Sequence, residues 1–406
     1  MDARNKPVIN VSYSYNPLEE TLEYDIKKKA VFIGIPKENS FQENRIALTP
    51  QAVAVIVNNG NRVVVEHHAG IASSFSDKDY SEAGAEIVYD KKEIFNADII
   101  LKTAPINHDE LELLKEGQMI FSPIHIPSLT KEYVKKCIDK KIIGIALGNI
   151  KDDAGNYPIV RSMSQIAGVF SIQIASKYLS NNHSGNGILL GGIAGVPPAN
   201  VVIIGAGMVG EYATRTALGC GAQVKVFDNS IYRLMRLQKT VGQMVYTSVI
   251  DPIQLASALE EADVAIGALK PVKGIVPMVV SEQMIERMRS GAVIIDVSID
   301  NGGCFETSSL TSHEDPTFEK HGVVHYCVPN IASGVSRTAS TAISNILMPL
   351  ILSCTNTVGS ANHILHNKPG LLAATYMYKG KMTSKVLSQK FDFKFTDLNL
   401  ILSSNL

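Results

Sequence analysis

The sequence carries almost no net charge. Its 38 lysines and arginines balance 39 aspartates and glutamates, which leaves a formal net charge of −1. A chain of this kind has no basic field that would hold a nucleic acid or an anionic membrane. The composition therefore argues against both partners and favours small metabolites.

Segments that would direct the chain into a membrane are also missing. No apolar run approaches the roughly twenty residues that span a bilayer. Residues 1–28 lack the basic start and apolar core of a secretory signal. We expect a soluble, cytoplasmic protein. Residues 1–28 read as an N-terminal extension, in which a helix over 17–29 is conceivable.

Cysteine is scarce, and its spacing shows no metal-binding pairs. The five cysteines are Cys137, Cys220, Cys304, Cys327 and Cys354. They are odd in number and form no CxxC or CxxxH motif. We expect free thiols in a reducing compartment, with neither a disulfide nor a metal site.

What the sequence does contain is a regular alternation of β-rich runs and helical periods. From Ala30 on, runs such as AVFIGIP, RVVVEHH and MIFSPIH alternate with amphipathic stretches. This alternation predicts an α/β fold with a largely parallel sheet. Thr49 as an N-cap and Pro50 at the first helical position predict a helix over residues 50–59.

A second set of alternating elements begins near Val160. It opens with a helix predicted from about Ser164 to Leu179 and ends at HGVVHYCVPN. The tail that follows opens with a helical pattern and has too few strand-like runs for a third domain, so we expect it to pack on the first. We predict two lobes: a Rossmann-type, doubly wound domain of residues 160–336, inserted in a discontinuous α/β domain of residues 1–159 and 337–406. The ligand site would lie in the cleft between them.

The most specific motif is VVIIGAGMVGEYATRTALGCGAQVKVFD, residues 201–228. A β-branched run precedes three glycines in GxGxxG spacing, a helical segment, a second apolar run and an acid. Gly205 permits a tight turn, Gly207 admits a pyrophosphate close to the backbone, and Gly210 lets the helix pack on its strand. The helix that starts at Met208 and Val209 offers N–H groups to the phosphates.

Asp228 closes this motif about twenty residues beyond the glycines. A carboxylate there bonds both ribose hydroxyls and repels a 2′-phosphate, so the motif predicts NAD. Arg233 lies nearby in the sequence and could bind a 2′-phosphate, so NADP remains an alternative cofactor. A glycine-rich turn in another α/β domain is the structural alternative.

Several separated strings resemble the alanine dehydrogenase and transhydrogenase α-subunit family. They occur in order between about Val31 and Pro349 and are GIPKE, ENRIALTP, SFSDKDYSEAGA, MSQIAG, GGIAGVPPANVVIIGAG, IDVSIDNGGCFE and YCVPN. The resemblance implies an NAD-dependent amino-acid dehydrogenase that converts L-alanine to pyruvate and ammonia, and the reverse. It also implies a homo-oligomer, a hexamer in the dehydrogenase branch and a dimer in the transhydrogenase branch.

The resemblance assigns roles to three polar side chains near strand ends. Arg45 is implied to hold the substrate carboxylate with its planar fork, and an ion pair with Glu43 or Glu38 is the structural alternative. His125 is implied to exchange a proton at the substrate oxygen, which suits a side chain that changes charge near physiological pH. Asp300 is implied to position water or ammonia, although an acid before Asn-Gly-Gly is also a common turn former.

Cofactor contacts are implied by the same resemblance, from the adenine ribose to the nicotinamide. They fall on Ser164, Asp228, Arg233, Ser248 and Asn330. Ser164 also reads as a helix cap, which is compatible with a cofactor contact. Asp296, in a buried strand, is interpreted as structural.

One departure from the family pattern concerns the substrate site. The dehydrogenases carry Lys-x-Lys-x-Pro after a strand, whereas this chain reads ADIILKTAPI, with Lys102 followed by Thr103, Ala104 and Pro105. Lys102 is the candidate to bind and polarise the substrate carbonyl if the local register allows it. Strand alternation points its side chain to the face opposite the missing lysine. This stretch is closer to the transhydrogenase form.

Other functions therefore stay open beside the dehydrogenase. They are a transhydrogenase-like NAD(H)-binding subunit with a membrane-bound partner, an NAD-binding regulator without turnover, and a reductive condensation of pyruvate with another amino acid's amine. His125 favours the dehydrogenase, because hydride exchange between two nicotinamides needs no such group. The string IDNGGCFE and the lack of an Arg-Gln-Asp loop near 161–165 favour it too.

Overall fold

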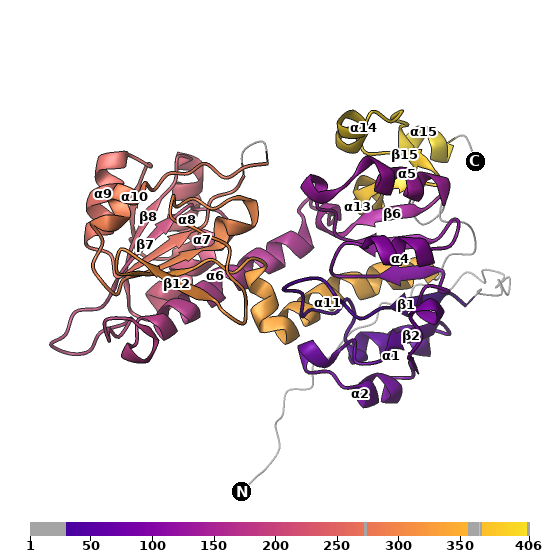
Figure 1. Ribbon diagram of the computed structural model, residues 1–406, viewed down its shortest axis with the longest axis horizontal. Coiled ribbons are helices and arrows are strands. Elements are labelled where there is room, and N and C mark those ends of the chain that lie inside the picture. Colours follow the sequence, from indigo (N-terminus) through magenta and orange to yellow (C-terminus); the bar gives the residue numbers. More distant parts are fainter. Residues whose placement is uncertain (1–29, 272–273, 356–364, 366–367, 404–406) are drawn as a thin grey trace, which may run out of the picture.

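The computed structural model describes residues 30–271, 274–355, 365 and 368–403. Two α/β lobes lie side by side, each built on its own twisted sheet, and two long helices run between them (Figure 1). The predicted fold class is confirmed. The helix considered over 17–29 lies outside the described residues. Within them, no helix is both long and apolar enough to cross a membrane.

The first lobe contains an eight-stranded sheet in the order β15-β14-β6-β5-β4-β1-β2-β3. The six strands from the N-terminal part of the chain pair in parallel, whereas β14 pairs antiparallel with β6 and β15 antiparallel with β14. The strands are β1 (Phe32–Ile35), β2 (Arg62–Glu66), β3 (Glu86–Val88), β4 (Ile99–Leu101), β5 (Met119–Ser122), β6 (Ile143–Ala146), β14 (Thr375–Tyr378) and β15 (Lys381–Met382).

Helices cover both faces of this sheet, so its central strands are buried throughout. All four residues of β5 and of β6 are buried, which explains their continuous apolar sequences. The helices are α1 (Pro50–Asn58), α2 (Asp77–Glu82), α3 (Lys91–Ile94), α4 (His108–Leu113), α5 (Lys131–Asp139), α13 (Pro369–Ala374), α14 (Lys385–Phe391) and α15 (Leu398–Ser403). Helix α1 begins as predicted, with Thr49 accepting a hydrogen bond from the backbone of Ala52, and ends one residue earlier than predicted.

The second lobe contains a seven-stranded sheet in the order β12-β13-β11-β10-β7-β8-β9, with only β12 antiparallel. Its strands are β7 (Asn200–Ile204), β8 (Gln223–Phe227), β9 (Tyr246–Ser248), β10 (Val264–Gly267), β11 (Val293–Asp296), β12 (Thr317–Lys320) and β13 (Val323–Tyr326). Its helices are α7 (Met208–Gly219), α8 (Ile231–Val241), α9 (Pro252–Glu260) and α10 (Glu282–Glu286). The order of the strands reverses between β7 and β10. In doubly wound sheets this reversal leaves a crevice at the carboxyl ends of the two strands, and ligands bind there.

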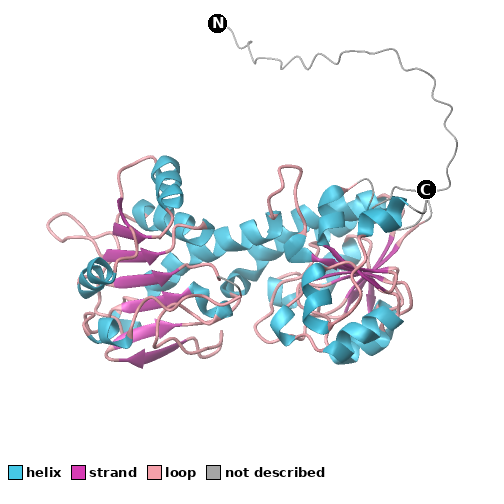
Figure 2. Cartoon of the chain, turned by 90° about the horizontal axis from the view of Figure 1, so that it is seen from above, coloured by secondary structure: helices cyan, strands magenta, loops and turns pink. Residues whose placement is uncertain are grey.

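Helices α6 (Pro158–Tyr178) and α11 (Ser336–Thr355) join the lobes and pack against each other (Figure 2). Helix α6 also packs on α7 of the second lobe, whereas α11 packs on α1 of the first. The predicted start of α6 at Ser164 is wrong. The helix begins at Pro158, because proline suits the first helical position, and Ser164 therefore lies inside the helix and caps nothing.

The C-terminal tail packs on the first lobe, as expected. Leu371, Leu398 and Leu402 belong to the same buried core as Ile33 and Phe121. The tail also adds β14 and β15 to that lobe's sheet, which the sequence pattern did not indicate. The domain bounds of 1–159 with 337–406 and of 160–336 stay a prediction.

Candidate functional site

The glycine-rich turn links β7 to α7 at the carboxyl edge of the second sheet. Gly205 has φ +114°, and a Cβ on it would lie 2.4 Å from the carbonyl oxygen of Ala268. A Cβ on Gly210 would lie 1.8 Å from the carbonyl oxygen of Gly205. Both positions therefore require glycine, for the turn and the close helix packing that the sequence predicted.

Gly207 is different, because the space beside it is open. A Cβ there would have only the Cε atom of Lys270 within 4 Å. Gly207 precedes the first residue of α7, Met208, whose helix N-terminus points free N–H groups toward the same space. An anionic group thus has room and donors at this turn.

Asp228 lies directly after β8, beside the glycine turn, and is 3% exposed. Its Oδ2 accepts a hydrogen bond from the backbone N–H of Ala206 at 2.8 Å, and its Oδ1 accepts one from Ser230 at 2.7 Å. Arg233 lies 3.5 Å from Oδ2, and the backbone carbonyl of Ser248 accepts from the Asp228 N–H at 3.1 Å. The structure thus brings the predicted ribose group, Asp228, Arg233 and Ser248, together at one sheet edge.

A cavity of about 510 Å³ lies between the lobes, in front of the glycine turn. Seven predicted site residues line it: Arg45, Ser164, Gly207, Met208, Val209, Asp300 and Asn330. Arg45 comes from the first lobe, Ser164 from the linking helix α6 and the other five from the second lobe. The cavity therefore exists only because the two lobes face each other.

Arg45 enters this cavity already paired. Its Nε donates to Glu43 Oε1 at 2.7 Å, its second terminal nitrogen lies 2.5 Å from Glu43 Oε2, and its side chain is 12% exposed. The remaining terminal nitrogen, Nη1, is directed to the sulfur of Met163 at 3.3 Å, its one hydrogen-bond contact among the described residues. The ion pair with Glu43 foreseen as the structural alternative is therefore present, and one end of the guanidinium remains without a carboxylate.

Asp300 faces Arg45 from the 3₁₀ turn Val297–Asn301. Its Oδ1 accepts a hydrogen bond from the backbone N–H of Asn330 at 2.8 Å. Removal of water by the cavity walls raises the pKa of the Asp300 carboxyl above its usual range, and Asn330, Arg45 and His125 oppose this rise. Asp300 is therefore a carboxylate that holds a proton more readily than an ordinary aspartate.

Asp296 is structural, as interpreted. It is 1% exposed and accepts hydrogen bonds from the backbone N–H groups of Ser298 and Cys304 and from the Ser308 hydroxyl. These bonds fix the loop that carries Asp300. The five cysteines carry free thiols.

Lys102 does not lie where the predicted contact with the substrate carbonyl would require it. Its side chain is 1% exposed and does not line the cavity; its Nζ lies 2.7 Å from Glu38 and 3.1 Å from Glu110. Burial alone would lower the pKa of this amine, but the two carboxylates outweigh burial and raise it. Because side chains alternate between the faces of a strand, Lys102 points away from the cavity, and its charge neutralises the buried carboxylates of Glu38 and Glu110.

His125 also lies outside the cavity lining, contrary to its predicted catalytic place. It sits three residues beyond β5 and is exposed, and its Nδ1 is 3.0 Å from the Ser128 hydroxyl. The loop leading into the 3₁₀ turn Ile126–Ser128 holds it there. Its charge still reaches Asp300, since it lowers the pKa of that carboxyl.

Lys270 and Thr103 are among the lining residues that no sequence motif had singled out. Lys270 follows β10, at the sheet edge that carries the glycine turn, so its position after ADVAIGAL was the available signal. Thr103, after β4, lines the first-lobe wall, and its hydroxyl donates to the backbone carbonyl of Arg45 at 3.0 Å. No comparable motif marked Thr103.

Two family profiles match nearly the whole described chain. The profile "Alanine dehydrogenase/PNT, N-terminal domain" matches residues 34–167, and "Alanine dehydrogenase/PNT, C-terminal domain" matches residues 171–385. The two matches meet inside α6, the helix that joins the lobes.

Curated relatives and solved structures agree with these profiles. The chain is 39% identical to alanine dehydrogenase of Methanococcus maripaludis, over 90% of this chain and 98% of the relative, and 38% identical to alanine dehydrogenase 2 of Staphylococcus aureus, over 89% and 97%. A solved L-alanine dehydrogenase superposes with a TM-score of 0.82 at 34% identity, covering 89% of this chain and 99% of that one. A transhydrogenase from Sinorhizobium meliloti, with a TM-score of 0.74 at 21% identity over 87% and 99%, shares the fold.

Proposed function

The chain belongs to the alanine dehydrogenase/PNT family, and from this premise we propose that it catalyses the NAD-dependent oxidation of L-alanine to pyruvate and ammonia, and the reverse amination. The observation that carries the proposal is the cavity between the lobes, which presents Arg45 and Asp300 in front of a glycine turn built for a dinucleotide. Both close curated relatives bear the name alanine dehydrogenase.

The residues at the second sheet fit a nicotinamide dinucleotide. Gly207 leaves open space at the start of α7, where the pyrophosphate would lie, and the exposed Lys270 borders that space. Asp228 would accept hydrogen bonds from the adenine ribose, which favours NAD over NADP. When bound, NAD would accept the hydride that leaves the α-carbon of alanine.

The chain's own side chains would orient the substrate and move protons. The guanidinium of Arg45 would hold the carboxylate through the end that now contacts Met163, without giving up Glu43. After hydride loss the substrate is an iminium. Ionised Asp300 would accept a proton from the water that adds to the iminium carbon, which gives a carbinolamine.

Loss of ammonia from the carbinolamine needs a proton on nitrogen and removal of one from oxygen. We assign this exchange to His125, which would have to approach the cavity from its present exposed position as the lobes close around substrate. Lys102 has no part in the scheme. Thr103 stands two residues before Pro105, where the family pattern has its second lysine, and leaves the carbonyl oxygen without that cation.

A non-catalytic NAD-binding role is the second candidate, and the observation that favours it is Thr103 in place of the second lysine, together with the buried Lys102. One assay separates the two functions: formation of NADH from NAD and L-alanine at alkaline pH, beside NADH binding followed by fluorescence. Turnover that Arg45→Ala abolishes supports the dehydrogenase. Tight NADH binding without turnover supports the regulator.

A hexameric assembly and a cytoplasmic location belong to the same proposal. They are supported only by the relatedness to alanine dehydrogenases, and light scattering of the purified chain tests the assembly. A dimer would favour the transhydrogenase-like alternative.

A further inference from the structure

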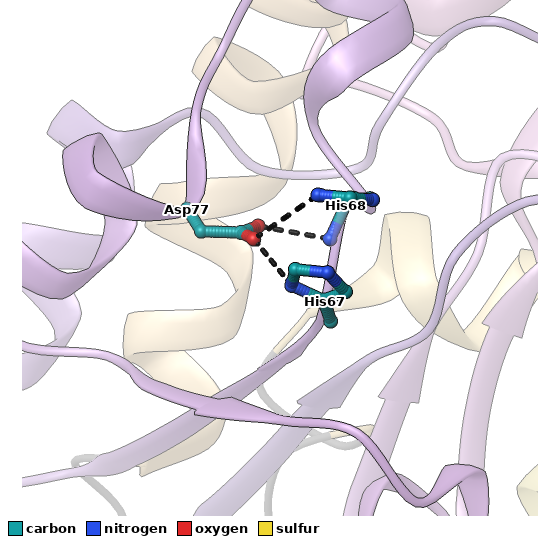
Figure 3. Close-up of side chains that lie close together, drawn as sticks. All are labelled: His67, His68 and Asp77. Atoms are coloured by element: carbon teal, nitrogen blue, oxygen red, sulfur yellow. Dashed lines mark hydrogen bonds and ion pairs between the residues drawn. The ribbon is translucent and has the colours of Figure 1, made fainter.

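Three side chains of metal-binding type converge where β2 ends, on the first lobe. They are His67 and His68, directly after the strand, and Asp77, the first residue of α2 (Figure 3). One nitrogen of each imidazole and one oxygen of the carboxylate all lie within 4.8 Å of one another. None of the three is used by the proposed dehydrogenase reaction.

The spacing of these atoms suits a small cation. His67 Nδ1 lies 2.6 Å and His68 Nε2 lies 3.9 Å from the same oxygen, Oδ2 of Asp77. Ligand atoms around a tetrahedral zinc ion lie about 3.3 Å apart, given Zn–N and Zn–O distances near 2.0–2.1 Å. The two observed distances lie on either side of this value, so to bind one ion His68 would have to approach Asp77 and His67 would have to move away from it.

His67 Nδ1 forms an ion pair with Asp77 Oδ2 but no hydrogen bond of regular geometry with the described residues. The atom is buried, and no hydrogen bond with acceptable geometry reaches it from the described residues, although Asp77 Oδ2 is so close. The nitrogen and the oxygen therefore lie beside each other rather than aimed at each other. A cation could bind both atoms in place of this pair once the two move apart.

The backbone holds His68 and Asp77 in place. His68 has φ +63°, a left-handed conformation that glycine adopts freely and side chains rarely adopt. Its backbone N–H donates to Asp77 Oδ1 at 2.9 Å, which leaves Oδ2 for the imidazoles. The chain thus keeps a histidine where the backbone favours glycine, and strain of this kind is common at binding sites.

We propose that His67, His68 and Asp77 form a binding site for Zn²⁺ or a similar borderline divalent cation, with water at the remaining position. Two imidazoles and one carboxylate are a ligand set that zinc prefers. The pattern CxxC or CxxxH could not reveal this site, because two ligands are adjacent in sequence and the third is nine residues on. The absence of a metal site expected from the cysteines is revised accordingly.

The site lies next to the substrate-binding wall. His68 lines a second cavity, of about 250 Å³, together with Glu38, Glu43 and Arg45. A cation held by His68 would therefore lie across this cavity from the Glu43–Arg45 pair. The proposal does not depend on the dehydrogenase function.

A second group of metal-ligating residues serves as the internal control. Glu282, Glu286 and His321 also lie within 4.8 Å of one another, but Glu282 is occupied by Lys320 at 2.6 Å and by His321 at 2.7 Å. Because the ammonium of Lys320 holds Glu282 and would repel a divalent cation, we expect no zinc site there.

The test is zinc binding by the full-length, chelator-treated protein, measured by competition with a chromogenic chelator, with Co²⁺ absorption as a second probe. We expect one equivalent of Zn²⁺ to bind, and His67→Ala and His68→Gly each to weaken this binding by more than about tenfold. His68→Gly is the informative variant, since glycine adopts φ +63° without strain. It removes the imidazole and should leave the backbone unchanged. His321→Ala should bind zinc like the wild type.

Two results would overturn the proposal. One is a wild-type protein that binds no zinc in competition with the chelator. The other is binding that neither His67→Ala nor His68→Gly weakens, which would place the ion elsewhere, for example at the exposed Cys220.

Discussion

The side-chain amide of Asn330 donates a hydrogen bond to Glu43 Oε2 at 3.2 Å, across the boundary between the two lobes. Glu43 is the carboxylate that pairs with Arg45, and the backbone N–H of Asn330 donates to Asp300. One residue in the left-handed conformation, with φ +53°, thus holds Asp300 directly and Arg45 through Glu43. The cationic and the anionic sides of the site are therefore positioned together.

Replacing Arg45 should remove substrate binding and leave the fold intact. We expect Arg45→Lys to lower kcat/KM for L-alanine by roughly 10- to 100-fold, because a lysine gives a charge without the fork, and a charge-assisted hydrogen bond contributes about 1.5–3 kcal/mol. Steady-state kinetics measures this. The matched control is Arg62→Lys, whose partner Glu86 is on the surface; equal losses in both variants would contradict the assignment.

Lys102 should be a structural residue. Lys102→Met leaves the buried carboxylates of Glu38 and Glu110 without their shared cation, so we expect a loss of about 3–5 kcal/mol in the free energy of unfolding. Denaturant unfolding measures it. Lys78→Met, at an exposed position, should change stability by less than about 0.5 kcal/mol. A stable Lys102→Met protein that has lost only activity would restore a catalytic role.

The pH dependence should report Asp300. Its ionised form is needed to accept a proton, and its pKa is raised by burial, so kcat/KM should fall with decreasing pH at a higher pH than an ordinary aspartate would give. Asp300→Asn should remove this acid limb. A profile that Asp300→Asn leaves unchanged would assign the limb to another group.

Asp228 should set the choice of cofactor. Asp228→Ser removes the charge that repels a 2′-phosphate and leaves Arg233, now 3.5 Å from the carboxylate, free to bind one. Fluorescence titration should show weaker NADH binding by at least about tenfold and tighter NADPH binding. The opposite response of the two dinucleotides is the control, because a misfolded protein would lose both.

Lys270 should strengthen dinucleotide binding through the pyrophosphate. Its Cε lies 4.0 Å from the position of a Cβ on Gly207, so its ammonium can reach the space in front of α7. We expect Lys270→Met to weaken NADH binding several-fold and to reduce its dependence on salt concentration. Lys239→Met, on the exposed face of α8, should bind NADH like the wild type; identical titrations for all three proteins would exclude the contact.

The amino-acid sequence by itself determined the local chemistry of this protein. Thr49 and Pro50 set the start of α1, the glycines of residues 205–210 set the turn and the close packing of α7, and Asp228 follows the next strand in any βαβ unit of this kind. These features depend on backbone conformation and on the spacing of apolar residues within a segment of about thirty residues. A single stretch of sequence is therefore enough to predict them.

The tertiary structure alone decided which charges meet. Strand alternation indicated that Lys102 points away from the site, but only the packed structure revealed that it forms ion pairs with Glu38 and Glu110. The pairing of Asn330 with Glu43, the addition of β14 and β15 to the first sheet, and the meeting of His67, His68 and Asp77 join segments through loops whose paths no local pattern fixes. Such contacts follow from how the buried faces of distant elements fit together, which is a property of the whole core and not of any one segment.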